Sequence, residues 1–389
     1  MAFRRADQPR LDLRAESGFG WALAGLGIAA LLAAVAARPT EAGSAASQVW
    51  TPFVLVVGLL LIGLVANDDR LFAAAGQRLA RTARNGAVVF AGAVAIVGVV
   101  TALLNLDTAV AFLTPVLVAT ARSRGEGDGP LLYGCLLLAN AGSLFLPGSN
   151  LTNLIVLGHL HLTGGQFFAR MWAPGLAALL ITGAVVAVFG RKALRVRTDA
   201  PGQAERPVLG LGLLAVVAAA FLVVLLRSPA LPVLAIGLVV VGARIATGRE
   251  RPGHAIGSLG LPVLVGLFGV AVALGTLGRV WTGPASLLSH LDTWGTAVVA
   301  ALISVLINNL PAAALLAAHR PPHPYALLIG LNVGPNLFVS GSLAWFLWLR
   351  AARAAGARPS LSTASRMGVV AVPLALTAAV GLLIVLGTH

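Results

Sequence analysis

Long apolar runs dominate the chain and alternate with short segments that are rich in arginine. Many of these runs approach or exceed about 17 residues, the length at which an apolar segment begins to indicate a membrane-spanning helix. Spans are predicted at 21–37, 50–66, 131–163, 171–190, 208–226, 229–247, 259–279, 325–350 and 366–387. The pattern predicts an all-α polytopic membrane protein. Its first run is expected to be a transmembrane helix rather than a cleaved signal peptide, because a polar segment precedes it and more spans follow.

Two further apolar stretches, 85–121 and 294–318, each carry a polar cluster near the middle. The cluster is NLDT (105–108) in the first stretch and NNLP (308–311) in the second. Asp107 is the only formal charge in residues 85–121. These stretches are therefore ambiguous as simple spans, and the distribution of charge decides how they are interpreted.

Composition supports a membrane protein over a soluble one. The chain is 58% hydrophobic and 10% charged, whereas a soluble domain carries about 25% charged residues. A net charge of +14 would suggest nucleic acid in a soluble protein, but here the basic residues act as topology signals. The single cysteine, Cys135, excludes an intrachain disulfide and a CxxC metal site, and it is expected to pack as a small hydrophobe.

Basic residues cluster between the spans, and the positive-inside rule assigns such clusters to the cytoplasm. The clusters are Arg4, Arg5, Arg10 and Arg14; Arg70, Arg78, Arg81 and Arg84; Arg122 and Arg124; Arg191, Lys192, Arg195, Arg197 and Arg206; Arg244, Arg249 and Arg251; and Arg350, Arg353, Arg358 and Arg366. All of these clusters lie on the cytoplasmic side of the membrane only if residues 85–121 return to the side from which they enter and residues 294–318 do not cross the membrane.

Both stretches are therefore predicted to be re-entrant hairpins, the first open from the cytoplasm and the second from the outside. Residues 85–121 are also long enough to cross twice, so that alternative stays open. The N-terminus is then cytoplasmic, the C-terminus lies outside, and the chain is a multi-pass protein of the inner (plasma) membrane. Opposite entry sides are expected of an inverted repeat.

The predicted organisation has four parts. These are an N-terminal segment with the first transmembrane helix (1–49); a first inverted repeat (50–190) with hairpin 85–121 and broken helix 131–163; a cytoplasmic linker plus two transmembrane helices (191–258); and a second inverted repeat (259–389) with hairpin 294–318 and broken helix 325–350.

The two halves echo each other at their hairpins. LLNLDTAVAFL (103–113) can be laid over LINNLPAAALL (306–316), which places Asn105 opposite Asn308. The same alignment puts Leu310 where the first half has Asp107, so the titratable group is present in one half only.

Each half also contains a Gly-x-Asn-Leu segment inside an apolar run, and the alignment pairs Gly148 with Gly334 and Asn150 with Asn336. Gly and Pro interrupt helices, and the freed backbone groups are tolerated in lipid only where they line a cavity or are buried in protein. Half-helix ends attract ions, anions at N-termini and cations at C-termini.

These breaks and hairpin tips predict a site for substrate or ion near the membrane midplane. Its candidate lining is Asn105, Thr108, Ser149, Asn150, Thr152, Asn153, Asn308, Asn309, Gly334, Asn336, Ser340 and Ser342. The alternative is that these side chains hydrogen-bond the helices to one another, as Asn and Ser do in membranes.

Asp107 is the candidate coupling residue, because ionisable residues within membrane segments are usually functional. No basic residue lies near it in the sequence. We interpret it as a proton or cation carrier at the hairpin tip. The alternative is an acid near the membrane surface, or one that is satisfied by a buried partner.

Two other polar groups are interpreted as structural. His159 and His161 stand two residues apart, on different faces of a helix, so they are expected to mark its outer end rather than to bind a metal. Asp68 and Asp69 are expected to form a solvated helix end that faces the cytoplasm.

Several segments resemble the ion-transporter superfamily that includes arsenite permeases, citrate permeases and divalent-anion/sodium symporters. They are NLDTAVAFLTP (105–115), GSNLTNLIVLG (148–158), INNLPAAALL (307–316) and GPNLFVSGSLAWFLWLR (334–350). The last is most similar to the arsenite permease (ArsB) branch, through Gly334, Pro335, Gly341, Ser342 and Leu343. The Ser-Asn-Thr triplet of the divalent-anion symporters is absent from both tips, which favours the arsenite branch.

The resemblance implies a scaffold domain, a moving transport domain and secondary transport that is driven by an ion gradient. The expected function is efflux of arsenite or antimonite in exchange for protons. The first alternative is proton- or sodium-coupled transport of a small carboxylate or other anion. An intramembrane enzyme would need paired carboxylates or a Ser/His/metal constellation, and the spans contain neither.

The expected partners are a small inorganic or carboxylate substrate and the lipid bilayer, with no nucleic acid. No cofactor is expected beyond the coupling ion, H+ or Na+. A homodimer is allowed, and membership of the arsenite branch would add a soluble ATPase.

The arginine pattern makes a prediction about sidedness. An impermeant thiol reagent added outside intact cells should label a cysteine introduced by His319→Cys and should not label one introduced by Arg358→Cys. Labelling of position 358 from outside would overturn the predicted topology.

Overall fold

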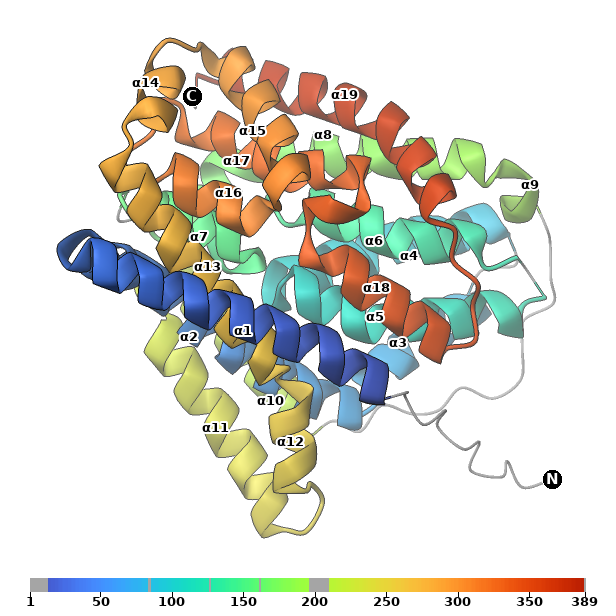
Figure 1. The fold of residues 1–389 in the computed structure, drawn as a ribbon. Helices are drawn as coiled ribbons and strands as arrows, with labels where there is room; N and C mark the ends of the chain where they lie inside the picture. Colours follow the sequence, from blue (N-terminus) through green and yellow to red (C-terminus); the bar gives the residue numbers. More distant parts are fainter. Residues whose placement is uncertain (1–12, 83–84, 126, 161, 196–209, 388–389) are drawn as a thin grey trace.

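The computed structural model describes residues 13–82, 85–125, 127–160, 162–195 and 210–387. This part of the chain is a bundle of helices and contains no β-strand (Figure 1). Six helices or helix pairs in it are long and apolar enough to cross a membrane, namely α1 (Leu13–Ala37), α2 (Pro39–Asp68), α4 (Gly86–Leu104), α8 (Gly164–Phe189), α12–α13 (Pro252–Val280) and α19 (Leu361–Val385). The predicted all-α polytopic protein is confirmed, while the inverted repeat stays a prediction.

The remaining elements, together with the two separate helices of the α12–α13 pair, complete the bundle. They are α3 (Leu71–Thr82), α5 (Leu106–Ser123), α6 (Gly129–Gly142), α7 (Leu151–Leu157), α9 (Arg191–Leu194), α10 (Leu211–Leu225), α11 (Ala230–Ala246), α12 (Pro252–Ser258), α13 (Leu261–Val280), α14 (Gly283–Ser289), α15 (Thr293–Ile307), α16 (Asn309–Leu316), α17 (Pro324–Val333) and α18 (Leu343–Ala354), with 3-10 turns η1 (Pro147–Ser149), η2 (Gly334–Leu337) and η3 (Val339–Gly341).

Helix α2 is longer than its apolar run suggests, because it begins at Pro39 rather than near residue 50. A proline at the first helical position costs no hydrogen bond, since that N–H has no partner within the helix anyway. The predicted boundary between residues 49 and 50 therefore falls inside α2. The amphipathic helix α3, which follows it, was not predicted.

Both predicted polar clusters are helix breaks. Asn105 separates α4 from α5 with φ 103°, and Asn308 separates α15 from α16 with φ 73°. Asparagine tolerates positive φ better than most residues, and each side-chain oxygen caps the next helix, at 2.8 Å from Thr108 N and 3.3 Å from Leu310 N. A short polar side chain thus closes each tip.

The arms of the two hairpins differ in length. Helix α4 has 19 residues and α16 has 8. At a rise of about 1.5 Å per residue these are ~28 Å and ~12 Å, against a hydrocarbon core of about 30 Å. The first hairpin therefore has an arm of full membrane thickness, whereas α16 reaches less than halfway.

Two more helices are interrupted in the middle of apolar runs. Residues 143–150 separate α6 from α7, and 334–342 separate α17 from α18. Each interruption contains a proline, Pro147 or Pro335, which cannot continue the backbone hydrogen bonding of a helix.

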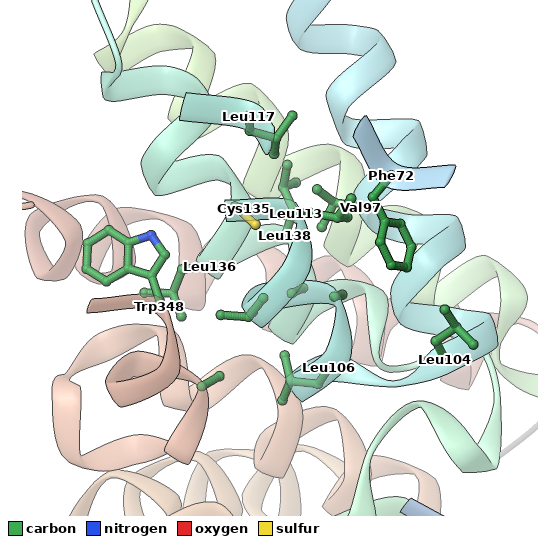
Figure 2. Close-up of a cluster of buried hydrophobic side chains, with 14 of the residues drawn as sticks. Phe72, Val97, Leu104, Leu106, Leu113, Leu117, Cys135, Leu136, Leu138 and Trp348 are labelled. Atoms are coloured by element: carbon green, nitrogen blue, oxygen red, sulfur yellow. The ribbon is translucent and has the colours of Figure 1, made fainter. Parts of the chain in front are cut away.

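The core between these elements is dense. Trp345 and Trp348 are fully buried on one face of α18, and their indole N–H groups donate to Pro335 O and Leu132 O, each at 2.8 Å. Cys135 is also fully buried, among leucine side chains that include Leu113 and Leu138 (Figure 2). The expectation that this cysteine packs as a small hydrophobe is confirmed.

One charged pair departs from expectation. Asp69 is 6% exposed, its carboxylate accepts from Gly212 N at 2.8 Å, and it lies 2.5 Å from the Arg244 guanidinium. Asp68 lies 3.9 Å from the same arginine. The prediction of a solvated acidic helix end was wrong, because a cation from the distant helix α11 lets the acid be buried.

Arg122 and Arg124 join helix ends at one end of the bundle. Arg122 donates to Ala355 O at 2.7 Å, which joins α5 to the end of α18, and Arg124 donates to Ala80 O at 2.8 Å, which joins the end of α5 to α3. We call this the arginine-rich end. In Figure 1, α9 and α14 lie at opposite ends of the bundle.

Helices α1 and α13 cross at glycines. A Cβ at Gly27 would lie 2.2 Å from Gly266 O, and one at Gly269 would lie 2.1 Å from Gly27 O. The two backbones therefore touch, as small residues allow in membrane helix pairs.

The crossing predicts a position-specific cost. Gly27→Val should separate α1 from α13 and lower the free energy of unfolding by about 2 kcal/mol, because no neighbouring side chain can move aside. Gly25→Val on the same helix is the control, since nothing lies within 4 Å of a Cβ there. Thermal unfolding in detergent would measure both, and equal shifts for the two variants would contradict the crossing.

Candidate functional site

A cavity of about 730 Å³ lies between α2, α5, α18 and the start of α13. Its walls are mostly apolar side chains, such as Leu60, Phe112 and Leu347. The polar and charged side chains that line it are Asn67, Asp107, Arg122, Ser258 and Arg350. A largely apolar cleft with few polar groups is typical of small-molecule sites.

Asp107 marks the inner end of this cavity. It stands in the first turn of α5, directly after the break, where the helix dipole favours a negative charge. Arg122, in the last turn of α5, also lines the cavity, and its side chain is 43% exposed. The two residues are ~22 Å apart along the helix axis, so the cavity runs from the arginine-rich end to the hairpin tip.

Among the residues that the structure describes, no basic side chain forms an ion pair with Asp107. The buried-partner alternative for this acid therefore has no support in that part of the chain. Of the predicted site residues, Asp107 is the one that lines the cavity.

Three buried polar atoms at the first tip make no hydrogen bond within the part of the chain that the structure describes. They are Asn105 Nδ2, Thr101 Oγ1 and Thr108 Oγ1, and a further one, Thr152 Oγ1, lies in the first turn of α7. Buried donors and acceptors normally find hydrogen bonds, and leaving them unmade is costly. None of these four residues lines the cavity, so a molecule in the cavity does not contact these atoms while the tip has this conformation.

A second group of polar side chains fastens the two broken helices together, and Asn332 of α17 is its centre. Asn332 Oδ1 accepts from Ser143 Oγ at 2.5 Å and from Asn150 Nδ2 at 2.7 Å. Its Nδ2 donates to Asn153 Oδ1 and to Leu328 O, both at 2.8 Å. All the hydrogen-bonding capacity of this amide is thus used.

A second pair of hydrogen bonds joins α6 to the 3-10 turn η2. Asn140 Nδ2 on α6 donates to Asn336 Oδ1 at 2.9 Å, and Asn336 Nδ2 donates back to Leu137 O at 3.0 Å. Ser342 Oγ lies 3.5 Å from Asn140 Oδ1. We call the buried set made by Asn140, Ser143, Asn150, Asn153, Asn332 and Asn336 the asparagine network.

This network also satisfies carbonyls that the break leaves open. Asn153 Nδ2 donates to Ser143 O at 2.7 Å and to Leu146 O at 3.2 Å. The Ser149 hydroxyl donates to Ser143 O at 2.5 Å and also contacts Leu146 O. Five of the predicted lining residues, Ser149, Asn150, Asn153, Asn336 and Ser342, therefore make contacts between or within the broken helices.

Sequence reasoning missed Asn140 and Asn332, which hold this network together. Both occur in an Asn-x-Gly triplet just before a break, with Gly142 and Gly334 as the third residues. That triplet was the available signal.

The predicted pairing of Gly148 with Gly334 was wrong. Gly148 stands just before the second half-helix α7, in η1, whereas Gly334 directly follows the first half-helix α17. Gly341, in η3 just before α18, is the positional counterpart of Gly148.

The second hairpin tip is a separate cluster. Asn308 Nδ2 donates to Ser340 O at 3.2 Å, and Ser340 Oγ donates to Val305 O at 2.6 Å. Asn309 is buried beside the tip, while Gly334 packs against the backbone of α15 at Ala301. These predicted site residues are not brought to the cavity.

The remaining candidate groups do not form a metal site. Within the described residues, no three His, Cys, Asp or Glu side chains are placed to hold a metal ion. His159 follows the end of α7 and its Nε2 lies 2.9 Å from Ala317 O, whereas His161 lies outside the described residues. The Thr114 hydroxyl donates toward Cys135 Sγ at 3.4 Å.

Broken helices that a buried polar network joins, beside a cavity that contains an acid, are typical of membrane transporters. The chain belongs to the family described as "Citrate transporter" (CitMHS), whose model matches residues 17–340. The protein is therefore a transporter and not an enzyme.

Relatives with similar sequences carry more specific names. The chain is 25% identical over 370 residues to the arsenical pump membrane protein of Escherichia coli K12, which covers 85% of each chain. It is 28% identical over 311 residues to the inner membrane protein YbiR of the same strain, with 78% of this chain and 80% of that one covered.

A solved structure shares the fold. The YdaH transporter of Alcanivorax borkumensis superposes with a TM-score of 0.53 at 16% identity, over 88% of this chain and 86% of that one.

The asparagine network predicts a large effect of one substitution. Asn332→Ala removes a partner from Ser143, Asn150 and Asn153 at once and should lower the free energy of unfolding by about 3 kcal/mol. Asn67→Ala on α2 is the matched control, because Asn67 faces the cavity. Thermal unfolding in detergent would compare the two, and similar small shifts would show that the network does not hold the broken helices.

Proposed function

We propose that this protein is a secondary active transporter that exports arsenite or antimonite across the inner membrane in exchange for protons. The observation that carries the proposal is the cavity that runs from the arginine-rich end to Asp107, an acid with no basic partner among the described residues. The names of the arsenical pump relatives supply the substrate.

The arginine-rich end is assigned to the cytoplasm by the positive-inside rule. In that orientation the cavity opens to the cytoplasm, the side from which an efflux substrate enters. The C-terminus then lies outside.

Asp107 is the proposed proton carrier. A carboxyl group at the inner end of an apolar cavity can take a proton when it is exposed to one side and lose it when exposed to the other. Its place beside a helix break at Asn105 suits this role, because the tip is the part of the hairpin that contacts both the cavity and the buried polar atoms.

The site suits an uncharged hydroxide better than an anion. Next to Asp107 the cavity wall is made of uncharged side chains such as Ala111 and Phe112, and arsenite can be held by hydrogen bonds alone. A thiolate cage is not available, since the single cysteine, Cys135, is fully buried in the core.

A small carboxylate is the second candidate, favoured by the family description and by Arg122 and Arg350 in the cavity wall. Arg122 lies in the last turn of α5, ~22 Å along the helix axis from Asp107, and Arg350 lies in the second half of α18. A carboxylate held there would not contact the proposed coupling residue, so export of a neutral species is preferred.

Expression in an arsenite-sensitive bacterium tests the substrate. The protein should raise resistance and lower cellular arsenic, and inverted vesicles should accumulate arsenite only when a proton gradient is imposed. Accumulation of citrate without arsenite would favour the carboxylate alternative, and dependence on sodium would replace the proton as the coupling ion.

Coupling is tested by Asp107→Asn, which should abolish gradient-driven transport in the same vesicles. The matched control is Asp292→Asn, an exposed acid at the start of α15, where asparagine caps a helix as well as aspartate does. Proton-driven transport that persists in folded Asp107→Asn protein would refute the assignment.

A further inference from the structure

Four segments meet through polar contacts at the end of the bundle opposite the cavity mouth. Gln48 comes from α2, Arg279 from the last turn of α13, His159 from the residues after α7, and Ala317 from the end of α16. These segments are far apart in the sequence, and none of the contacts follows from the predicted substrate site.

Gln48 is the hub of this cluster. Its Nε2 donates to Ile155 O at 3.0 Å and to Ala317 O at 2.9 Å, and its Oε1 accepts from the Arg279 guanidinium at 2.6 Å. Both amide hydrogens are thereby used. The 3.3 Å approach of Gln48 Nε2 to His159 Nε2 is therefore a contact between two donors rather than a hydrogen bond.

These contacts are made to backbone carbonyls at the C-terminal ends of two helices. His159 Nε2 lies 2.9 Å from Ala317 O, so this carbonyl accepts from both the histidine and the glutamine. Ile155 O and Ala317 O belong to the C-terminal ends of α7 and α16, where carbonyls carry partial negative charge, and Ile155 O also accepts a long bond of 3.4 Å from Gly158 N. The Arg279 cation is bonded to the oxygen of the Gln48 amide, whose nitrogen binds both carbonyls.

The helices below this cluster are packed tightly. A Cβ at Gly278 on α13 would lie 2.6 Å from Leu315 O of α16, and one at Gly275 would lie 3.2 Å from the Cβ of Ala45 on α2. At the arginine-rich end, by contrast, the cavity separates α2 and the start of α13 from α5 and α18. The molecule is open at one end and closed at the other.

We propose that Gln48, Arg279 and His159 form a latch that closes this end of the transport path and must open once in each transport cycle. The latch ties α2 and α13 to the ends of the half-helices α7 and α16, so substrate cannot leave past α16 while it is intact. The inference rests on the transporter class and not on arsenite, protons or the membrane orientation.

The chemistry suits a reversible latch. Each bond joins groups that water can also satisfy, so breaking it at the surface costs little net free energy. Gln48 and Arg279 are half-buried rather than enclosed, so water can reach them when the helices separate.

The test is thiol accessibility in purified protein, which needs no substrate. A reporter cysteine at Ala314→Cys lies on α16 one turn before Ala317, at a position that is 1% exposed. Adding Arg279→Gln, or separately Gln48→Leu, should raise its rate of reaction with a maleimide by about tenfold. Arg320→Gln is the matched control, because that arginine is exposed.

Cys135 provides the internal check, because it is 0% exposed in the core. A latch predicts faster labelling at position 314 while Cys135 stays unreactive. Equal rates in the Arg279→Gln and Arg320→Gln variants, or parallel labelling of Cys135, would overturn the proposal.

A bridged variant covers the case in which those changes prevent folding. Gln48→Cys and His159→Cys, joined by a short thiol-reactive linker in the presence of Ala314→Cys, should slow labelling at position 314 by about tenfold. Cutting the linker should restore the rate. A labelling rate at position 314 that is the same with and without the linker would overturn the proposal. Neither result depends on what the protein transports.

Discussion

The constraint on which the structure depends is that backbone polar groups in a membrane must find partners inside the protein. The breaks at residues 143–150 and 334–342 open two helices at segments where most residues are buried inside the bundle. Asn153 and Ser149 take up the freed carbonyls, and Asn332 joins the first break to α17. The bundle can contain irregular backbone because uncharged side chains supply the hydrogen bonds that water would otherwise make.

Much of the fold could be predicted from the sequence, because a membrane span is a property of one continuous segment. The apolar runs located helices, although several of these, such as α10 and α11, are shorter than a full span, and the polar clusters located the breaks at Asn105 and Asn308. The contacts between segments were harder. Asn332 meets Ser143 across 189 residues of sequence, and the burial of Asp69 depends on Arg244, 175 residues away. No local sequence pattern encodes a contact between such distant residues. Polar residues that join helices therefore cannot be told apart, from the sequence alone, from polar residues that line a site.

The two hairpins share a geometry and differ in chemistry. The first tip carries Asp107, and its buried Asn105 Nδ2 has no hydrogen-bond partner among the residues that the structure describes. At the second tip, Leu310 takes the place of the acid and the Asn308 amide is bonded to Ser340 O. Within the described part of the chain, Asp107 is the one carboxyl group that lines the cavity, and the tip without an acid does not line it.

The asparagines at the two tips also restrict what these positions can become. Glycine would adopt the positive φ without strain but would leave the next helix uncapped, and most other side chains would cap poorly or resist that backbone. Few residues meet both demands at Asn105 and Asn308. The two positions are therefore natural reference points for comparing one half of the chain with the other.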